Sequence, residues 1–418
     1  MNEKQNLRLK RNVGLDYVHT FLSNMNMQSS IWVLYLAYCG MHLAQIGLLE
    51  GIYHATSIVC VIPSGAAADL WGRKRCMVLS NLCIAVSCVI MLFSKSFGWF
   101  AVSFAVQALG NNLNSGSEEA LVYDSMKCLG QEEHYMGVYG RRNVLIEVAQ
   151  GLATVAGGVL AEFSYFWCYA ACVVIAVLAL LPVLWMAEPP QCGKTADTAG
   201  GSAKDAPAEG TPAQRTTRET VKHHFAVSAC ILQKDARIGK IIGFYSVVFA
   251  THTLLFFYSQ QYFADLGYNK VQISVIMLLV GGASCFGALA SEKMYRRFGK
   301  RCLIPETVII AAAILCYGSG KAGVAAAALM CAGFANAALY PVQSDSLNAL
   351  IPSEQRATLI SVDSMCFSIA MIVLFPLAGA LADRWGLKTV LLLLGAILLL
   401  FLLTVICIEK ESFSSGHS

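Results

Sequence analysis

Gly65-Ala-Ala-Ala-Asp69-Leu-Trp-Gly72-Arg73-Lys74-Arg75 is the stretch of sequence that decides the fold. Its opening phrase is a Gly followed four residues later by a polar residue, with apolar residues between. The phrase returns as Gly158-Val-Leu-Ala-Glu162, Gly287-Ala-Leu-Ala-Ser291 and Gly379-Ala-Leu-Ala-Asp383. The first two copies are 93 residues apart, the last two 92 apart, and the first and third 222 apart. A phrase that recurs at a fixed period predicts repeated structural units, here two in each of two similar halves.

Composition places the chain in a membrane. It is 56% hydrophobic and 13% charged, with a mean hydropathy of +0.58. Soluble domains carry roughly 25% charged residues, so this chain lacks the polar surface that a soluble protein needs. Uninterrupted apolar runs such as 167–186 and 389–408 reach the roughly 20 residues that cross a bilayer as a helix. We therefore predict an all-α membrane protein.

Twelve spans are expected, six on each side of one long polar segment. Their predicted limits are 15–38, 43–66, 76–94, 98–126, 138–161, 165–187, 239–264, 270–291, 302–320, 322–349, 355–382 and 388–408. Of the 30 lysines and arginines, five fall in loops opposite the N-terminus, namely Lys95, Lys270, Lys321, Arg384 and Lys388. Because cytoplasmic loops carry the excess of positive charge, both termini of this multi-pass membrane protein are expected in the cytoplasm.

The polar segment sets the expected domain boundaries. Residues 1–187 form one six-helix bundle, 188–237 a cytoplasmic linker, and 238–418 a second six-helix bundle. The linker is rich in Gly, Ala, Thr and Pro and is expected to be largely disordered, with an amphipathic surface helix after residue 220. Within each half the first phrase copy lies at the inner end of its helix and the second at the outer end. The halves therefore consist of inverted three-helix repeats.

The Gly65–Arg75 stretch resembles the signature between helices 2 and 3 of major facilitator superfamily transporters, and the resemblance covers the whole chain. Nested inverted repeats are the architecture of that superfamily. Stretches that begin at Ser117, Gly140 and Asn348 resemble a bacterial branch of drug and tetracycline-type exporters, which implies a location in the bacterial plasma membrane. This chain departs from two patterns of the drug–proton antiporters. The stretch Val106-Gln107-Ala-Leu-Gly110 lacks their Arg, and Ala153-Thr154 stand in place of their Gly-Pro pair, ahead of Gly157.

The resemblance implies a cytoplasmic gate. Asp69 is expected to meet the N-terminus of the eleventh span, where a helix end favours negative charge. Arg73 and Arg75 are expected to pair with carboxylates at the inner end of the fourth span. The predicted gate residues are Gly65, Asp69, Gly72, Arg73, Arg75, Asp124 and Arg141. The copy at Gly379 is expected only to repeat the fold on the opposite side.

A substrate cavity is predicted from four polar or aromatic stripes at helical spacing. They lie on spans 1, 4, 7 and 10, one from each repeat, whereas spans 6 and 12 hold no strongly polar residue. Polar stripes inside spans either join helices or line a cavity, and their quarterly recurrence favours a central cavity. The predicted substrate-binding residues are Asn24, Gln28, Gln107, Asn111, Asn114, Ser115, Tyr245, Phe249, His252, Phe256, Asn336, Tyr340 and Gln343.

Four ionisable residues inside predicted spans are candidates for proton coupling, since such residues are costly in a membrane unless they have a function. Glu118 lies on the stripe of span 4 and is preferred, followed by Glu147 in span 5. Glu50 and His54 share a face of span 2.

We expect a proton-coupled secondary transporter that exports a small amphipathic molecule. Uptake of a nutrient or metabolite is the alternative, and a transport-inactive receptor is the alternative of another class. The sequence contains no nucleotide-binding Gly-x-x-x-x-Gly-Lys motif, no catalytic triad and no metal-ligand pattern. We therefore predict that the protein is not an enzyme, and we predict no catalytic residues, no cofactor and no metal. The expected partners are the substrate, the proton and the lipid bilayer, with no nucleic acid, and the protein is expected to be a monomer.

Overall fold

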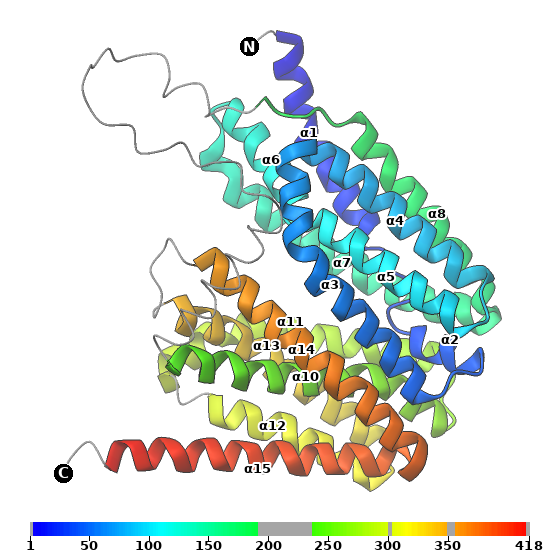
Figure 1. Cartoon of the computed structure of the whole chain (residues 1–418), viewed down its shortest axis with the longest axis vertical. Coiled ribbons are helices and arrows are strands. Elements are labelled where there is room, and N and C mark those ends of the chain that lie inside the picture. The colour runs from blue at the N-terminus through cyan, green and yellow to red at the C-terminus, as the bar shows by residue number, and fades with distance from the viewer. Residues whose placement is uncertain (1–2, 191–235, 300–302, 349–355, 415–418) are drawn as a thin grey trace. The chain divides into compact units, whose positions relative to one another are not determined.

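The computed structural model describes residues 3–190, 236–299, 303–348 and 356–414, and this part of the chain is helical without a strand (Figure 1). Besides two short 3-10 turns, its helices are α1 (Glu3–Ser23), α2 (Trp32–Tyr38), α3 (Leu43–Trp71), α4 (Arg73–Phe93), α5 (Phe97–Asn114), α6 (Ser117–Cys128), α7 (Tyr135–Phe163), α8 (Tyr165–Trp185), α10 (Ala236–Asp265), α11 (Lys270–Phe298), α12 (Leu303–Cys316), α13 (Ala322–Asn348), α14 (Arg356–Trp385) and α15 (Leu387–Ser414). The predicted all-α membrane fold is confirmed.

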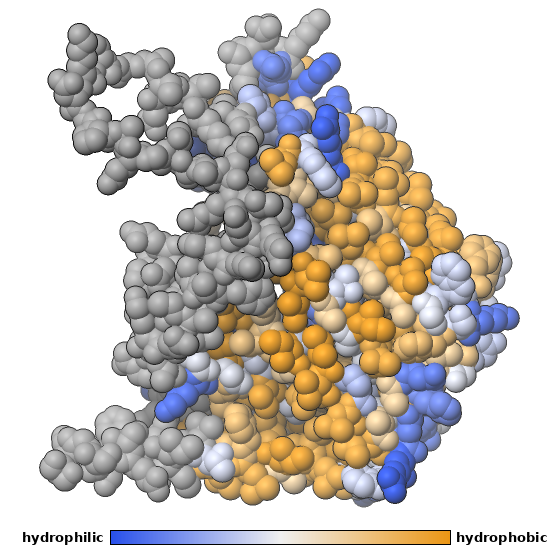
Figure 2. All heavy atoms as spheres, viewed as in Figure 1, coloured by the Kyte–Doolittle hydropathy of each residue, from blue (hydrophilic) through white to orange (hydrophobic). Residues whose placement is uncertain are grey.

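Nine of the described helices are long and apolar enough to cross a membrane: α3, α4, α7, α8, α10, α11, α13, α14 and α15. The stretch Ile304–Ser319 is apolar but shorter. Apolar side chains cover much of the visible helical surface, as expected for helices that face lipid (Figure 2). These ten segments correspond to ten of the twelve predicted spans.

The other two predicted spans are interrupted. Predicted span 15–38 is α1 and α2, separated by the non-helical stretch 24–31, and α1 begins at Glu3, well before the predicted start. Predicted span 98–126 is α5 and α6, which meet at Ser115 and Gly116. Gly116 has φ of +76°, in the left-handed region where a residue without Cβ is least strained. The prediction of one continuous helix was therefore wrong in both places.

Two compact units are present, and they do not follow the two halves of the sequence. Of the described residues, unit 1 holds 3–26, 56–153 and 169–190, and unit 2 holds 27–55, 154–168 and those from 236 onward. Unit 2 thus contains parts of α3 and α7 together with α10 to α15. The predicted boundaries at 188 and 237 stay a prediction, because most of the segment between them lies outside the described residues.

Small residues set the helix packing inside each unit. In unit 1, a Cβ built at Gly110 of α5 would stand 3.1 Å from side-chain atoms of Cys83 and Ile84 on α4. In unit 2, a Cβ at Gly287 of α11 would stand 2.1 Å from the carbonyl oxygen of Phe334 on α13. Glycine lets helix backbones come close enough for such contacts in a membrane, where packing and hydrogen bonds drive association.

Candidate functional site

A buried cluster of charged residues lies inside unit 1. Arg142 of α7 stands between Asp16 of α1 and Glu118 of α6. Its Nε is 3.0 Å from Asp16 Oδ2, and its Nη2 is 2.8 Å from Glu118 Oε1. The three residues are 5%, 0% and 7% exposed, respectively. Three separate helices therefore bring two carboxylates to one guanidinium away from solvent.

Hydrogen bonds fix the position of Glu118 from both sides. Thr20 of α1 donates its hydroxyl to Glu118 Oε1 at 2.8 Å, and Asn114 donates its amide to Oε2 at 2.9 Å. Arg142 Nε also lies 3.3 Å from the Thr20 hydroxyl, to which it donates. Both carboxylate oxygens of Glu118 thus have partners, and these partners come from α1, α5 and α7.

The cluster sits where a helix is interrupted. Asn114 is the last residue of α5, and Glu118 lies in the first turn of α6. The first turn of a helix exposes backbone N–H groups and carries partial positive charge, which favours a carboxylate there. Interrupted helices near the middle of a transporter are where substrate and coupling ions bind. The charged cluster therefore lies directly at the break in predicted span 4.

Counted alone, the charges of Arg142, Asp16 and Glu118 do not balance if both carboxylates are ionised. Arg142 supplies one positive charge against the two negative charges of Asp16 and Glu118. Removing an unpaired charge from water is costly, so a further positive charge, supplied by a bound proton or by a neighbouring basic group, would balance these three residues. The other titratable groups that act on the cluster electrostatically are His19, Glu119 and Tyr135.

Only Glu118 of this cluster was predicted from the sequence. Asp16, His19 and Thr20 follow the i, i+3, i+4 spacing of a helix face, and this signal was available in the sequence. Arg142 was missed because it counted as one of the basic residues near a cytoplasmic loop. His19 accompanies the cluster, and its Nδ1 lies 3.0 Å from the Ala179 carbonyl oxygen.

The predicted substrate residues of the first half have separate environments. Asn24 accepts a hydrogen bond from Gln150 and donates one to the Thr20 carbonyl oxygen. Gln28 is buried in the non-helical stretch between α1 and α2. On α5, Gln107 is half-buried and Asn111 is exposed, whereas Asn114 binds Glu118. Ser115 is exposed at the break.

The predicted residues of the second half lie on α10 and α13 inside unit 2. The Phe249 ring contacts two other rings, with its centroid 5.7 Å from that of Tyr245 and 6.1 Å from that of Tyr340. Buried Asn336 Oδ1 and His252 Nε2 have no hydrogen-bond partner among the described residues. Phe256 contacts Phe257, and Gln343 donates to Asp363 on α14 at 2.7 Å. A common cavity for both halves stays a prediction.

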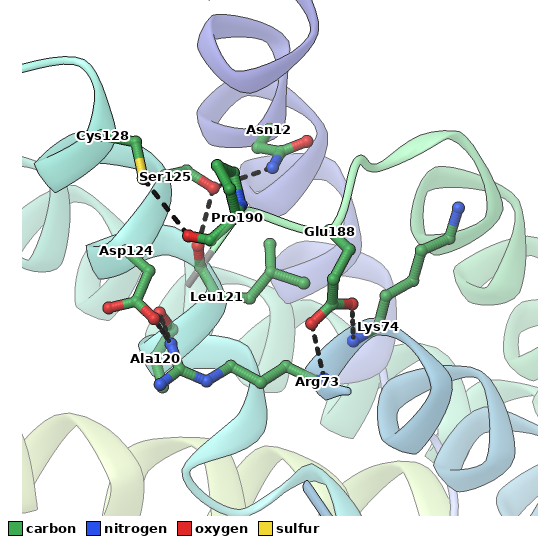
Figure 3. A network of polar contacts seen from close by, with 10 residues as sticks. All are labelled: Asn12, Arg73, Lys74, Ala120, Leu121, Asp124, Ser125, Cys128, Glu188 and Pro190. Carbon is green, nitrogen blue, oxygen red and sulfur yellow. Dashed lines mark hydrogen bonds and ion pairs between the residues drawn. The ribbon is translucent and has the colours of Figure 1, made fainter. Parts of the chain in front are cut away.

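Arg73 and Asp124 of the predicted gate form an ion pair, and Arg73 also donates to the Ala120 carbonyl oxygen (Figure 3). Gly72, with φ of +92°, turns the chain from α3 into α4. Gly65, Arg75 and Arg141 are exposed. The Asp69 side chain and residues 349–355, where it was expected to bind, lie outside the described residues. The gating role therefore stays a prediction.

Glu188 was not predicted, yet it holds the start of α4. Its carboxylate accepts the backbone N–H groups of Arg73 and Lys74, both at 2.8 Å (Figure 3). The Lys74 ammonium reaches the carbonyl oxygens of Leu184 and Met186 at the end of α8. This contact is internal to the first half of the sequence.

The remaining proton-coupling candidates are residues of α3 and α7. Glu147 is an exposed residue of α7. Glu50 and His54 are buried in unit 2, where their Oε1 and Nε2 atoms are 3.6 Å apart. His54 Nδ1 lies 3.2 Å from the Ser368 hydroxyl on α14.

Membrane-spanning helices with an internal repeat and an interrupted span define a polytopic transporter of the kind built from inverted repeats. The sequence model of the Major Facilitator Superfamily matches residues 18–320 and 307–416. The chain therefore belongs to this superfamily.

Relatives support the same assignment. An uncharacterized MFS-type transporter, YxaM of Bacillus subtilis, is 21% identical over 395 residues, which cover 92% of each chain. An uncharacterized transporter of Buchnera aphidicola is 28% identical over 145 residues, covering 34% of this chain and 35% of that protein. Both relatives are described as transporters.

Solved structures share the fold. The nucleoside transporter NupG has a TM-score of 0.75 at 14% identity, covering 98% of this chain and 100% of that chain. A bacterial homolog of the human lysosomal transporter Spinster gives 0.71 at 14%, covering 98% of each. A D-xylose-proton symporter gives 0.66 at 13%, covering 96% and 97%. At these identities the likeness concerns the fold alone.

Proposed function

We propose that the protein is a proton-coupled secondary transporter that works by alternating access, with Glu118 and Asp16 as the proton-binding pair. The single observation that carries this proposal is the buried cluster of two carboxylates and one guanidinium at the interrupted span. Ionisable groups inside a membrane bundle mark proton and substrate pathways in transporters.

The cluster suggests how a proton would change the protein. With one proton bound, Asp16, Glu118 and Arg142 together carry no net charge. When that proton leaves, a second negative charge appears beside the first turn of α6. The hydrogen bonds from Thr20 and Asn114 to Glu118 then strengthen, because bonds to a carboxylate are stronger than bonds to a neutral carboxyl. Proton loss would thus tighten the contact of α6 with α1 and α5.

Export of a small amphipathic molecule is the direction we propose, on the resemblance of the Ser117, Gly140 and Asn348 stretches to drug exporters. Uptake is the second candidate, and the absence of the Gly-Pro pair before Gly157 favours it. The proposed location is the bacterial plasma membrane, with both termini in the cytoplasm and the protein a monomer. The substrate would bind along the stripes of spans 1, 4, 7 and 10, without enzymatic change.

Proton coupling is tested with purified protein in liposomes under an imposed pH gradient. Ethidium, tetracycline, uridine and D-xylose serve as transport probes, covering export substrates and possible nutrients. We expect gradient-driven accumulation of at least one probe by the parent protein. Glu118→Gln and Asp16→Asn are each expected to lower this accumulation about tenfold, while exchange of the same probe without a gradient persists.

Glu133→Gln is the matched control, because it removes a carboxylate from an exposed position just before α7 and outside the set of proton-coupling candidates. We expect it to keep both the accumulation and the exchange. Accumulation by the parent that ignores the pH gradient would refute proton coupling. Equal gradient dependence in Glu118→Gln and the parent would refute the role of Glu118.

A further inference from the structure

Two of the four phrase copies end in a carboxylate that holds the start of another helix. Asp383, at the end of α14, accepts the backbone N–H groups of Leu43 and Ala44 at 3.0 and 2.8 Å. Glu162, at the end of α7, accepts the backbone N–H of Lys270 at 2.9 Å. These N–H groups begin α3 and α11, where no intrahelical partner exists for them. We name these contacts the α3 joint and the α11 joint; both lie inside unit 2.

The two helix starts are built alike. In α3 the backbone N–H of His42 donates to Gln45 Oε1 at 3.1 Å, three residues on. In α11 the backbone N–H of Asn269 donates to Gln272 Oε1 at 3.0 Å, again three residues on. In each case the carboxylate from the other helix accepts the next N–H along the chain, that of Leu43 in α3 and that of Lys270 in α11. The two joints are thus equivalent positions of the internal repeat.

The glycine of each phrase brings the helices close enough for the carboxylate to reach. A Cβ at Gly379 would stand 2.2 Å from the carbonyl oxygen of Leu43. A Cβ at Gly158 would stand 2.0 Å from the Ser274 hydroxyl and 2.9 Å from the Lys270 carbonyl oxygen. The glycine and the carboxylate are four residues apart, so they share one helix face. One phrase therefore supplies both the close approach and the polar contact.

Both joints connect the first half of the sequence with the second. α3 and α7 precede the 191–235 segment, whereas α11 and α14 follow it. Gln260 of α10 adds a third connection, since it donates to the Ser29 carbonyl oxygen at 3.0 Å and accepts the Val33 N–H at 3.4 Å. Tyr258 donates its hydroxyl to the carbonyl oxygens of Leu43 and Phe375.

We propose that Asp383 and Glu162 are a pair of latches that hold the two halves together at the end of the molecule where α3 and α11 begin. In transporters of this architecture, access alternates by rocking one half against the other. Opening at this end must break the hydrogen bonds of Asp383 to the start of α3 and of Glu162 to the start of α11, since each joint links the two halves. The latches thus set how often this end opens.

The charge of each carboxylate strengthens its latch. A carboxylate at a helix start gains from charge-assisted hydrogen bonds and from the partial positive charge of that helix end. Asn or Gln at the same place keeps one acceptor oxygen and loses the charge. Asp383→Asn and Glu162→Gln are therefore expected to loosen the joints and leave the helices intact.

The test measures how easily this end opens. Ser368→Cys, placed in a variant without other cysteines, serves as the reporter because Ser368 is buried against His54 of α3. The labelling rate of this cysteine by a membrane-impermeant maleimide is measured in right-side-out and in inside-out vesicles. We expect the double variant Asp383→Asn with Glu162→Gln to raise the labelling rate about tenfold in one of the two vesicle orientations. Each single substitution is expected to raise this rate less.

Glu188→Gln is the matched control. Glu188 binds two backbone N–H groups at the start of α4 with the same geometry, but within the first half of the sequence. It should leave the labelling rate unchanged. A double variant that labels as slowly as the reporter parent would overturn the proposal, as would an equal rise in Glu188→Gln. Labelling needs neither substrate nor pH gradient, so its outcome is independent of the proton-coupling experiment.

Discussion

Replacement of Arg142 by Met is expected to destabilise the protein by about 3–5 kcal/mol, because it leaves two buried carboxylates without their positive partner. Met has a similar length and no charge, so the change removes the ion pairs with little loss of volume. The expected observation is a marked fall in the midpoint of thermal unfolding of the detergent-purified protein.

A triple variant separates the charge effect from a packing effect. When Asp16→Asn and Glu118→Gln accompany Arg142→Met, no uncompensated charge remains in the cluster. We expect the triple variant to recover most of the lost stability, as is known when buried ion pairs are replaced as a set. A triple variant as unstable as Arg142→Met alone would show that Arg142 acts by packing.

Gly379→Ala is expected to destabilise the crossing of α3 and α14 by about 1–3 kcal/mol, since the added methyl group collides with backbone. Its Cβ would meet the Leu43 carbonyl oxygen at 2.2 Å and the Tyr258 hydroxyl at 2.7 Å. A backbone carbonyl cannot rotate away as a side chain can. The measurement is again the midpoint of thermal unfolding in detergent.

Gly281→Ala is the control for that substitution. Gly281 lies in α11, and apart from the nearby backbone of its own helix no described atom stands within 4 Å of its Cβ position. Alanine there is expected to leave the midpoint unchanged or to raise it slightly, because alanine favours a helix more than glycine does. Equal midpoints for Gly379→Ala and Gly281→Ala would show that the crossing relaxes without cost.

Hydrophobic periodicity and the repeated phrase predicted the helical architecture, because both depend on patterns that a single sequence displays. They did not predict the interruption at Ser115 and Gly116. A lone glycine in an apolar helix is common in membrane proteins, where it serves close packing. Whether it ends a helix depends on what surrounds it, here a glutamate with partners on α1 and α7.

The candidate site was predicted only in part for a similar reason. Glu118 stood out as a charged residue on a polar stripe. Asp16 and Arg142 lie near the predicted ends of their spans, where charged residues normally face water. Their pairing depends on the packing of α1 against α7, which a one-dimensional pattern does not contain. The role of Asp383 was likewise underestimated, because the α3 joint links residues 340 positions apart.

The helix starts that depend on distant carboxylates have a consequence for the order in which the protein matures during synthesis. The ribosome makes the first turn of α4 long before Glu188, which lies 115 residues after Arg73. The first turn of α3 meets its carboxylate later still, when Asp383 emerges. Until then these N–H groups must be hydrated, so nascent α3 and α4 keep their first turns in contact with water. Completion of the chain itself is what gives those N–H groups their carboxylate partners.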